Sequence, residues 1–182
     1  AIKICKKDRP GPVWLDVALD IQWSDIEFKK EKKLIFNNLI SKKNMDSKFY
    51  KILNYIEKSE KPLVIAGSGI KQGNCENNFL SFIKKNNIPF VTTWNSADIT
   101  SSDDINNLGI IGMSGQRGAN KALFQADLLI CLGTHLPIPH TTTLYKTYAP
   151  KSKKVIINID NNELKNLNVK FDLKICEDVK NF

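Results

Sequence analysis

The sequence contains few of the residues that dedicated nucleic-acid readers use. Of its 27 basic residues only Arg9 and Arg117 are arginine, whereas proteins that read bases and phosphates usually rely on arginine forks. The lysines are spread along the chain, and no aromatic residues alternate with them to form a stacking platform. The formal charge of +8 therefore does not by itself predict a nucleic-acid partner, and we expect none.

Long apolar runs, paired cysteines and clustered histidines are also missing. No run approaches the roughly 20 apolar residues that span a bilayer, and the N-terminus lacks the pattern of a signal peptide, so we expect a cytoplasmic protein without a membrane partner. The four cysteines include no Cys-x-x-Cys pair, which favours buried free thiols. His135 and His140 are the only histidines, and their spacing suits neither a metal pair nor a shared base. We expect no metal site.

Short apolar runs alternate with helix-like segments from residue 46 onward. The runs hold the β-branched and aromatic residues that buried strands favour. This alternation predicts an α/β fold with a doubly wound, mostly parallel six-stranded sheet and helices on both faces, of the Rossmann-like type. The expected strands are residues 63–66, 88–93, 128–132, 155–159 and 173–176, and the expected helices are residues 46–59, 76–86 and 118–125.

The first 45 residues differ in character from the rest. A turn at Pro10-Gly11-Pro12 leads into an apolar run from Val13 to Val17, and no helical pattern follows that could cover it. This is typical of a strand that ends a domain. The next segment is polar and rich in lysine, as linkers are. The sequence thus predicts the C-terminal tail of a preceding domain at 1–23, a linker at 24–45 and a central Rossmann-like domain at 46–182.

A series of motifs connects this layout to a known family. The segment Arg9-Pro-Gly-Pro-Val13, with Asp20 and Gln22 after it, resembles the end of the pyrimidine-binding domain in thiamine-diphosphate-dependent enzymes of the acetolactate synthase group. The rest of the chain is similar to that family's central domain, with its motifs in the same order. These motifs are Lys61-Pro-Leu-Val-Ile-Ala-Gly-Ser-Gly-Ile70, Ile88-Pro-Phe-Val-Thr-Thr-Trp-Asn95, Gly112-Met-Ser-Gly-Gln-Arg-Gly-Ala-Asn120, Ala126-Asp-Leu-Leu-Ile-Cys-Leu-Gly133 and Ile157-Asn-Ile-Asp160.

The resemblance implies a cofactor surface along the carboxyl ends of the strands, where open α/β sheets bind ligands. In the flavin-containing relatives FAD lies across this domain. The corresponding positions are Gly67, Ser68, Gly69, Thr92, Thr93, Met113, Ser114, Gly115, Gly133, Asp160, Asp178 and Val179.

Two features of the residues themselves bear on this surface. The glycines Gly67 and Gly69, with Gly73, could let the backbone approach a pyrophosphate or could simply form a tight turn, and both interpretations stay open. Flavin-binding relatives have a basic and acidic cluster after the residue that corresponds to Gly133, whereas this chain continues Thr-His-Leu-Pro-Ile-Pro-His140. This departure counts against FAD binding, although it does not exclude it.

Arg117 is a lone arginine in a glycine-rich loop at the expected start of a helix. It could pair with a carboxylate of a neighbouring domain or with an anionic ligand, or it could hold its own loop. The resemblance places it near the entrance of the active site.

The resemblance puts the chemistry of the family outside these residues. Thiamine diphosphate needs a glutamate that activates its aminopyrimidine, and Mg²⁺ holds the diphosphate through a Gly-Asp-Gly motif. The family carries the first in its pyrimidine-binding domain and the second in its diphosphate-binding domain, and this sequence contains no Gly-Asp-Gly. We therefore expect no catalytic residue in this segment.

The resemblance as a whole implies the central domain of a homo-oligomeric, acetolactate-synthase-like enzyme. Such an enzyme decarboxylates an α-keto acid such as pyruvate and ligates the product to an acceptor. The central domain would position the two cofactor-binding domains and would be inactive alone. Two alternatives remain open: a stand-alone nucleotide- or flavin-binding module without catalysis, and a basic nucleic-acid-binding protein.

Overall fold

The computed structural model describes residues 1–6, 9–25, 46–143 and 145–182. The chain divides into two compact units, Ala1–Asn44 and Met45–Phe182. Most of the expected linker lies outside the described residues. Among the helices that are described, none is long and apolar enough to cross a membrane.

The first unit contains two short helices, α1 (Ile2–Lys6) and α2 (Leu19–Gln22). The strand expected from Val13 to Val17 was wrong for this structure, because these residues form no strand and their side chains are exposed. A β-strand needs a neighbour to receive its backbone hydrogen bonds, and the described part of this unit supplies none. Large apolar side chains are left in solvent as a result, among them Trp14 at 89% exposure.

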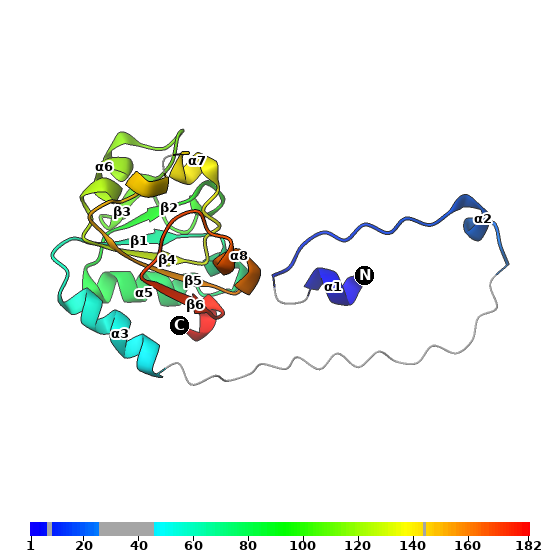
Figure 1. The fold of residues 1–182 in the computed structure, drawn as a ribbon, viewed down its shortest axis with the longest axis horizontal. Coiled ribbons are helices and arrows are strands. Elements are labelled where there is room, and N and C mark those ends of the chain that lie inside the picture. Colours follow the sequence, from blue (N-terminus) through cyan, green and yellow to red (C-terminus); the bar gives the residue numbers. More distant parts are fainter. Residues whose placement is uncertain (7–8, 26–45, 144) are drawn as a thin grey trace. The chain divides into compact units, whose positions relative to one another are not determined.

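The second unit is built on a six-stranded sheet in the order β3-β2-β1-β4-β5-β6, which can be followed in Figure 1. All five strand pairings are parallel. The chain winds outward from β1 in one direction and from β4 in the other, so the sheet is doubly wound as predicted. The strands are β1 (Pro62–Ala66), β2 (Phe90–Thr92), β3 (Asn107–Ile110), β4 (Leu128–Leu132), β5 (Lys153–Asn158) and β6 (Leu173–Cys176).

The sixth strand, β3, lies inside a segment that the apolar pattern predicts to be irregular. It is short, it contains Gly109 at a φ of +100°, and its register with β2 shifts between Phe90 and Thr92. None of its four residues is fully buried. Such an edge strand lacks the continuous apolar run that marked the other strands.

Helices connect the strands, and the three predicted from the sequence are confirmed to within two residues at each end. Helix α5 is followed by the cap residue Asn87, which adopts the left-handed conformation at a φ of 49° that asparagine tolerates at helix ends. The helices are α3 (Asp46–Glu57), α4 (Gly69–Gln72), α5 (Glu76–Asn86), α6 (Arg117–Gln125), α7 (Ile138–Thr141) and α8 (Asn161–Lys165), with 3₁₀ turns η1 (Trp94–Ser96), η2 (Tyr145–Thr147) and η3 (Val179–Asn181).

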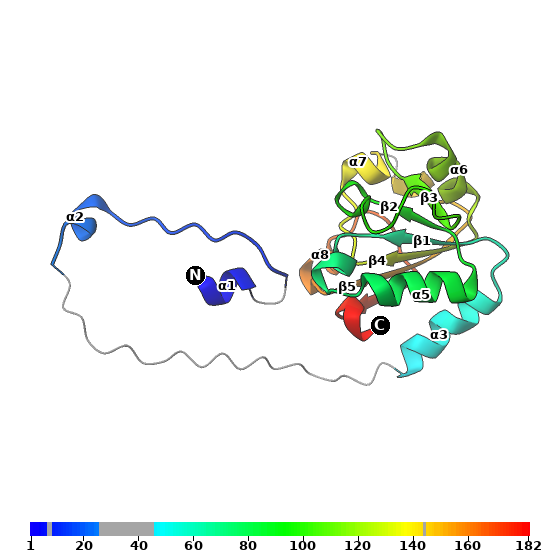
Figure 2. The same cartoon turned by 180° about the vertical axis from the view of Figure 1, so that it is seen from behind.

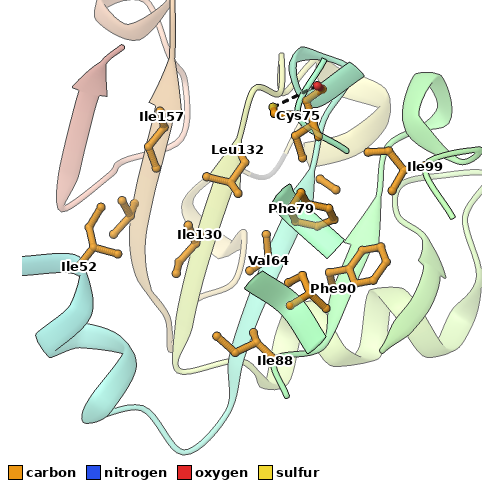
Figure 3. Packing of buried hydrophobic residues seen from close by; sticks show 14 of the residues in the cluster. Ile52, Val64, Cys75, Phe79, Ile88, Phe90, Ile99, Ile130, Leu132 and Ile157 are labelled. Carbon is orange, nitrogen blue, oxygen red and sulfur yellow. Dashed lines mark hydrogen bonds between the residues drawn. The ribbon is translucent and has the colours of Figure 1, made fainter. Parts of the chain in front are cut away.

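Two apolar cores lie on opposite faces of the sheet. Alternate side chains along each strand point to opposite faces, so Val64 joins the core under α3 and α5 whereas Leu63 joins the core under α6. Figures 1 and 2 show these helices on the two sides of the sheet. In the first core Phe79 meets Phe90 edge to face, with ring centroids 5.2 Å apart, as Figure 3 shows.

The cysteines are free thiols, as expected. Cys75 and Cys131 are buried, but Cys176 is exposed, because alternation along β6 turns Ile175 inward and its neighbour outward. Burial raises the pKa of the Cys131 thiol, so this residue behaves as a small apolar side chain.

Asp127 secures the turn between α3 and β1. Its carboxylate accepts hydrogen bonds from the Ser59 hydroxyl, from the amide of Glu60 at 2.8 Å and from the amide of Lys61 at 3.1 Å. Partial burial raises the pKa of Asp127, but these hydrogen bonds together outweigh burial and leave its pKa below the usual value. This contact fixes the start of β1 against the start of β4.

Candidate functional site

The carboxyl ends of β1 and β4 meet at the point where the sheet reverses its winding direction. Gly67 and Gly133 follow these strands, and a Cβ atom on Gly67 would overlap the backbone of Gly133 and Thr134. The Gly67 amide donates to Leu132 O at 2.9 Å, and the Gly69 amide donates to Gly133 O at 2.9 Å. The glycines therefore allow two loops to pack backbone against backbone, and two of the three amides in Gly67–Gly69 are occupied by that contact.

Thr92, the last residue of β2, and Thr93 lie beside this glycine contact and are both buried. The Thr93 amide donates to Ala66 O at 3.2 Å, and the Ser96 hydroxyl donates to the same oxygen at 2.6 Å. Thr93 and Ser96 also form a reciprocal cap at the start of η1. Sequence reasoning identified Thr92 and Thr93 but missed Ser96, which a Thr-x-x-Ser spacing could have indicated.

Asp160 and Asp178 follow β5 and β6, as predicted. Asp160 caps α8 by accepting hydrogen bonds from the amides of Asn162 at 2.9 Å and Glu163 at 3.2 Å. Asp178 caps η3 by accepting from the Lys180 amide at 2.9 Å. Both carboxylates thus cap local helices at the edge where the cofactor was expected.

The loop after β3 is held from within by two side chains of the α6 region. The Gln116 side chain accepts a hydrogen bond from the Ile110 amide. Asn120 accepts from the Gly112 amide at 3.0 Å and donates to the Gly112 carbonyl at 2.9 Å. Gly112 has a φ of +105°, and a Cβ there would lie 2.6 Å from Pro139 O, so the loop also packs tightly on the segment after β4.

Arg117 and Met113 project from this loop. Arg117 is exposed and makes no hydrogen bond or ion pair with the described residues, and Met113 is 72% exposed. Ser114 is also exposed, whereas Gly115 is partly covered. Because Gln116 and Asn120 hold the loop, Arg117 is not the residue that does so.

The segment after β4 carries both histidines on different surfaces. His135 is exposed and pairs with Glu163 at the start of α8. His140 is partly buried, and its ring lies edge-on to Trp94 with centroids 5.3 Å apart. Burial lowers the pKa of His140. Over the described ranges, no group of three or more histidine, cysteine or acidic side chains is placed to hold a metal ion.

The predicted positions therefore fall into separate groups. The structure brings Gly67, Gly69, Gly133 and Val179 together, since a Cβ on Gly133 would lie 3.0 Å from Val179 Cγ2. Thr92 and Thr93 adjoin this group, and Asp178 lies beside Gly73. The Met113–Arg117 loop instead contacts the segment after β4, where the Met113 amide donates to Pro139 O at 2.8 Å.

The residues were tested against the cofactors that the family resemblance implies. The amides at Gly67 and Gly69 already donate to backbone carbonyls, and the segment 134–140 that follows Gly133 contains no arginine or lysine. This arrangement does not fit the pyrophosphate group of FAD. The Gly-Asp-Gly motif that holds the metal and the diphosphate of thiamine diphosphate in this family is also missing from the sequence.

The strand order and the glycine contact at its switch point define a Rossmann-like α/β domain. Residues 50–182 match the family described as thiamine pyrophosphate enzyme, central domain. The chain belongs to this family.

Similar proteins extend well beyond the chain. It is 30% identical over 186 residues to the probable acetolactate synthase large subunit of Methanococcus aeolicus, covering 99% of this chain and 30% of that protein. It is also 30% identical to the acetolactate synthase large subunit of Lactococcus lactis, over 99% of this chain and 31% of that protein.

A second kind of relative is named for a different activity. The 3D-(3,5/4)-trihydroxycyclohexane-1,2-dione hydrolase of Shouchella clausii is 28% identical over 88% of this chain and 24% of that protein. The chain thus spans about a third or less of the curated relatives that it matches.

Proposed function

We propose that this chain is the central domain of an acetolactate-synthase-like enzyme that decarboxylates an α-keto acid such as pyruvate and joins the product to an acceptor. Thiamine diphosphate and Mg²⁺ would be held by the pyrimidine- and diphosphate-binding domains of the same enzyme, which would act as a homo-oligomer in the cytoplasm. In this proposal residues 1–23 are the tail of the pyrimidine-binding domain. The segment alone is inactive.

The match of residues 50–182 to the central-domain family supports this proposal, and the exposed face of the Met113–Arg117 loop suggests where the domain meets the active site. Gln116 and Asn120 fix the loop backbone, and the exposed Arg117 has no hydrogen bond or ion pair with the residues that the structure describes. A lone guanidinium in this state is suited to a bidentate bond with a carboxylate or phosphate. The proposed partner is an acidic group at the active-site entrance, supplied by a neighbouring domain or by substrate.

We further propose that the domain acts as a scaffold without FAD. The glycine positions that FAD contacts in flavin-containing relatives are used here for loop packing, and Asp160 and Asp178 cap local helices. What remains for the domain is to space and orient the two cofactor-binding domains.

The first experiment compares the 182-residue chain with the product of the whole reading frame that contains it. With thiamine diphosphate and Mg²⁺, the longer protein should release CO₂ from pyruvate and form acetolactate, whereas the 182-residue chain should do neither. Thiamine-dependent CO₂ release by the short chain would refute the inactive-segment proposal. A longer protein that acts only on another diketone or keto acid would refute the acetolactate assignment.

The second experiment tests Arg117 in the active protein. Arg117→Ala should raise KM for the keto acid or lower kcat, whereas Lys121→Ala, also exposed on α6, should change neither. If both KM and kcat are unchanged in Arg117→Ala, a role of Arg117 at the active-site entrance is refuted. A flavin spectrum retained by the 182-residue chain through desalting would contradict the scaffold proposal and favour a flavin-binding module.

A further inference from the structure

The hydroxyl group of a buried tyrosine near α6 has no structural role in the packing around it. Tyr148 is 4% exposed, and its hydroxyl makes no hydrogen bond with any described residue. Buried tyrosines normally place this group against a partner, because a hydroxyl left unpaired loses its hydration without compensation. Phenylalanine would fill the same apolar space without that loss.

Tyr148 belongs to the lining of a pocket of about 290 Å³. Helix α6 contributes Leu123 and Phe124 as apolar walls, and the segment after β4 contributes His140 and Tyr148. Both ring nitrogens of His140 are buried, and neither has a hydrogen-bond partner in the described chain. Two unsatisfied polar side chains from different turns therefore line one cavity, which is a pattern of binding sites rather than of cores.

The protonation states make this lining polar but uncharged. Burial, with a smaller contribution from nearby Cys131, raises the pKa of Tyr148 well above its usual value, so the phenol keeps its proton. Burial lowers the pKa of His140, which favours the neutral imidazole. A neutral imidazole offers one donor and one acceptor nitrogen.

The uncharged lining and the small volume of the pocket limit the class of ligand that it can bind. None of the lining residues carries a charged side chain at neutral pH, so a charged ligand would lose hydration without gaining a counter-ion. The volume is near the lower end for ligand pockets, which limits the occupant to about one ring with a small substituent. The groups to be satisfied are a hydroxyl donor and an imidazole.

We propose that this pocket binds a small uncharged ring compound bearing an amide, whose carbonyl accepts a hydrogen bond from Tyr148 and whose N–H bonds to His140. The ring would lie against Leu123 and Phe124. The site lies beyond the glycine contact and the aspartates of the strand ends, and the proposal does not depend on the assigned reaction.

The probe is benzamide, with toluene as the apolar control and benzoate as the charged control. Each is titrated into the full 182-residue chain while NMR follows the ring signals of His140 and Tyr148. Benzamide should shift both signals and bind about tenfold more tightly than either control. Absence of a shift at millimolar benzamide, or equal binding of toluene, would overturn the proposal.

Tyr148→Phe tests the hydroxyl itself, because it keeps the ring. Benzamide affinity should fall about five- to tenfold, and the unliganded variant should melt at a higher temperature than the wild type, since an unpaired buried hydroxyl is gone. Tyr50→Phe, at a tyrosine that is 69% exposed, should change neither quantity. A Tyr148→Phe variant with a lower melting temperature, or with an unchanged affinity for benzamide, would show that the hydroxyl does not serve ligand binding.

Discussion

Replacing Asp127 by asparagine should destabilise the second unit by about 2 kcal/mol. The carboxylate accepts hydrogen bonds from Ser59, Glu60 and Lys61, and hydrogen bonds to a charged group contribute about 1.5–3 kcal/mol each when buried. Because the site is partly open to solvent, we discount their sum. Asparagine keeps one oxygen acceptor but turns an NH₂ group toward backbone amides, which leaves donors facing donors.

The assay is urea unfolding followed by circular dichroism, at several pH values. The pKa of Asp127 is lowered in the folded state, so its stabilising effect is complete above the unfolded pKa of about 3.9 and is lost as pH falls through the folded value. The difference between wild type and Asp127→Asn should therefore be constant from neutral pH to about pH 5 and should shrink below about pH 4. The slope of the unfolding curve should not change.

Asp103→Asn is the matched control, because Asp103 is exposed and its carboxylate makes no hydrogen bond with the described residues. It should change the free energy of unfolding by less than about 0.5 kcal/mol. Equal effects of the two substitutions, or an Asp127 effect that persists undiminished at pH 3, would refute the reasoning.

The remaining predictions concern glycine, asparagine and the first unit. Gly67→Ala should lower the free energy of unfolding by more than about 2 kcal/mol in urea melts, since its Cβ would overlap the backbone after β4. Gly118→Ala has open space around its Cβ and should raise the free energy of unfolding by up to about 1 kcal/mol through helix propensity. Equal effects would contradict the close approach. Asn120→Ala should cost about 1–3 kcal/mol and increase proteolysis of the Met113 loop; an intact, protease-resistant loop would contradict its role. Deleting residues 1–22 should leave the melting temperature within a few degrees, and a collapse would show that this arm belongs to the core.

The sequence predicted the sheet well because its central strands are continuous apolar runs. β4 and β6 have the predicted bounds, and β1 differs by one residue. β3 was missed because an edge strand with an internal glycine has no such run. The strand predicted from Val13 to Val17 was wrong for the opposite reason. These residues have strand-like side chains, but a strand forms only beside a neighbouring strand, which the local sequence does not encode.

The places of the candidate residues along the sheet followed from the sequence, but their contacts did not. Glycines and aspartates after the strands were expected at one edge, and the structure places them there. Which atoms they approach depends on loops distant in sequence, as when Gly67 meets Gly133. Likewise, no local pattern indicates that Gln116 takes over the loop-holding role that Arg117 could have had, or that Asp127 reaches Ser59 across 68 positions.

Because the apolar residues are divided between the two faces of the sheet, a substitution in one core should leave the packing of the other core unchanged. Phe79 and Leu123 belong to different cores, and the two cores have no described residue in common. Truncations at these two positions should therefore have additive effects on stability. A cavity made on one face can be filled only by larger side chains on that same face. Compensating substitutions should therefore occur in pairs within one core and not across the sheet.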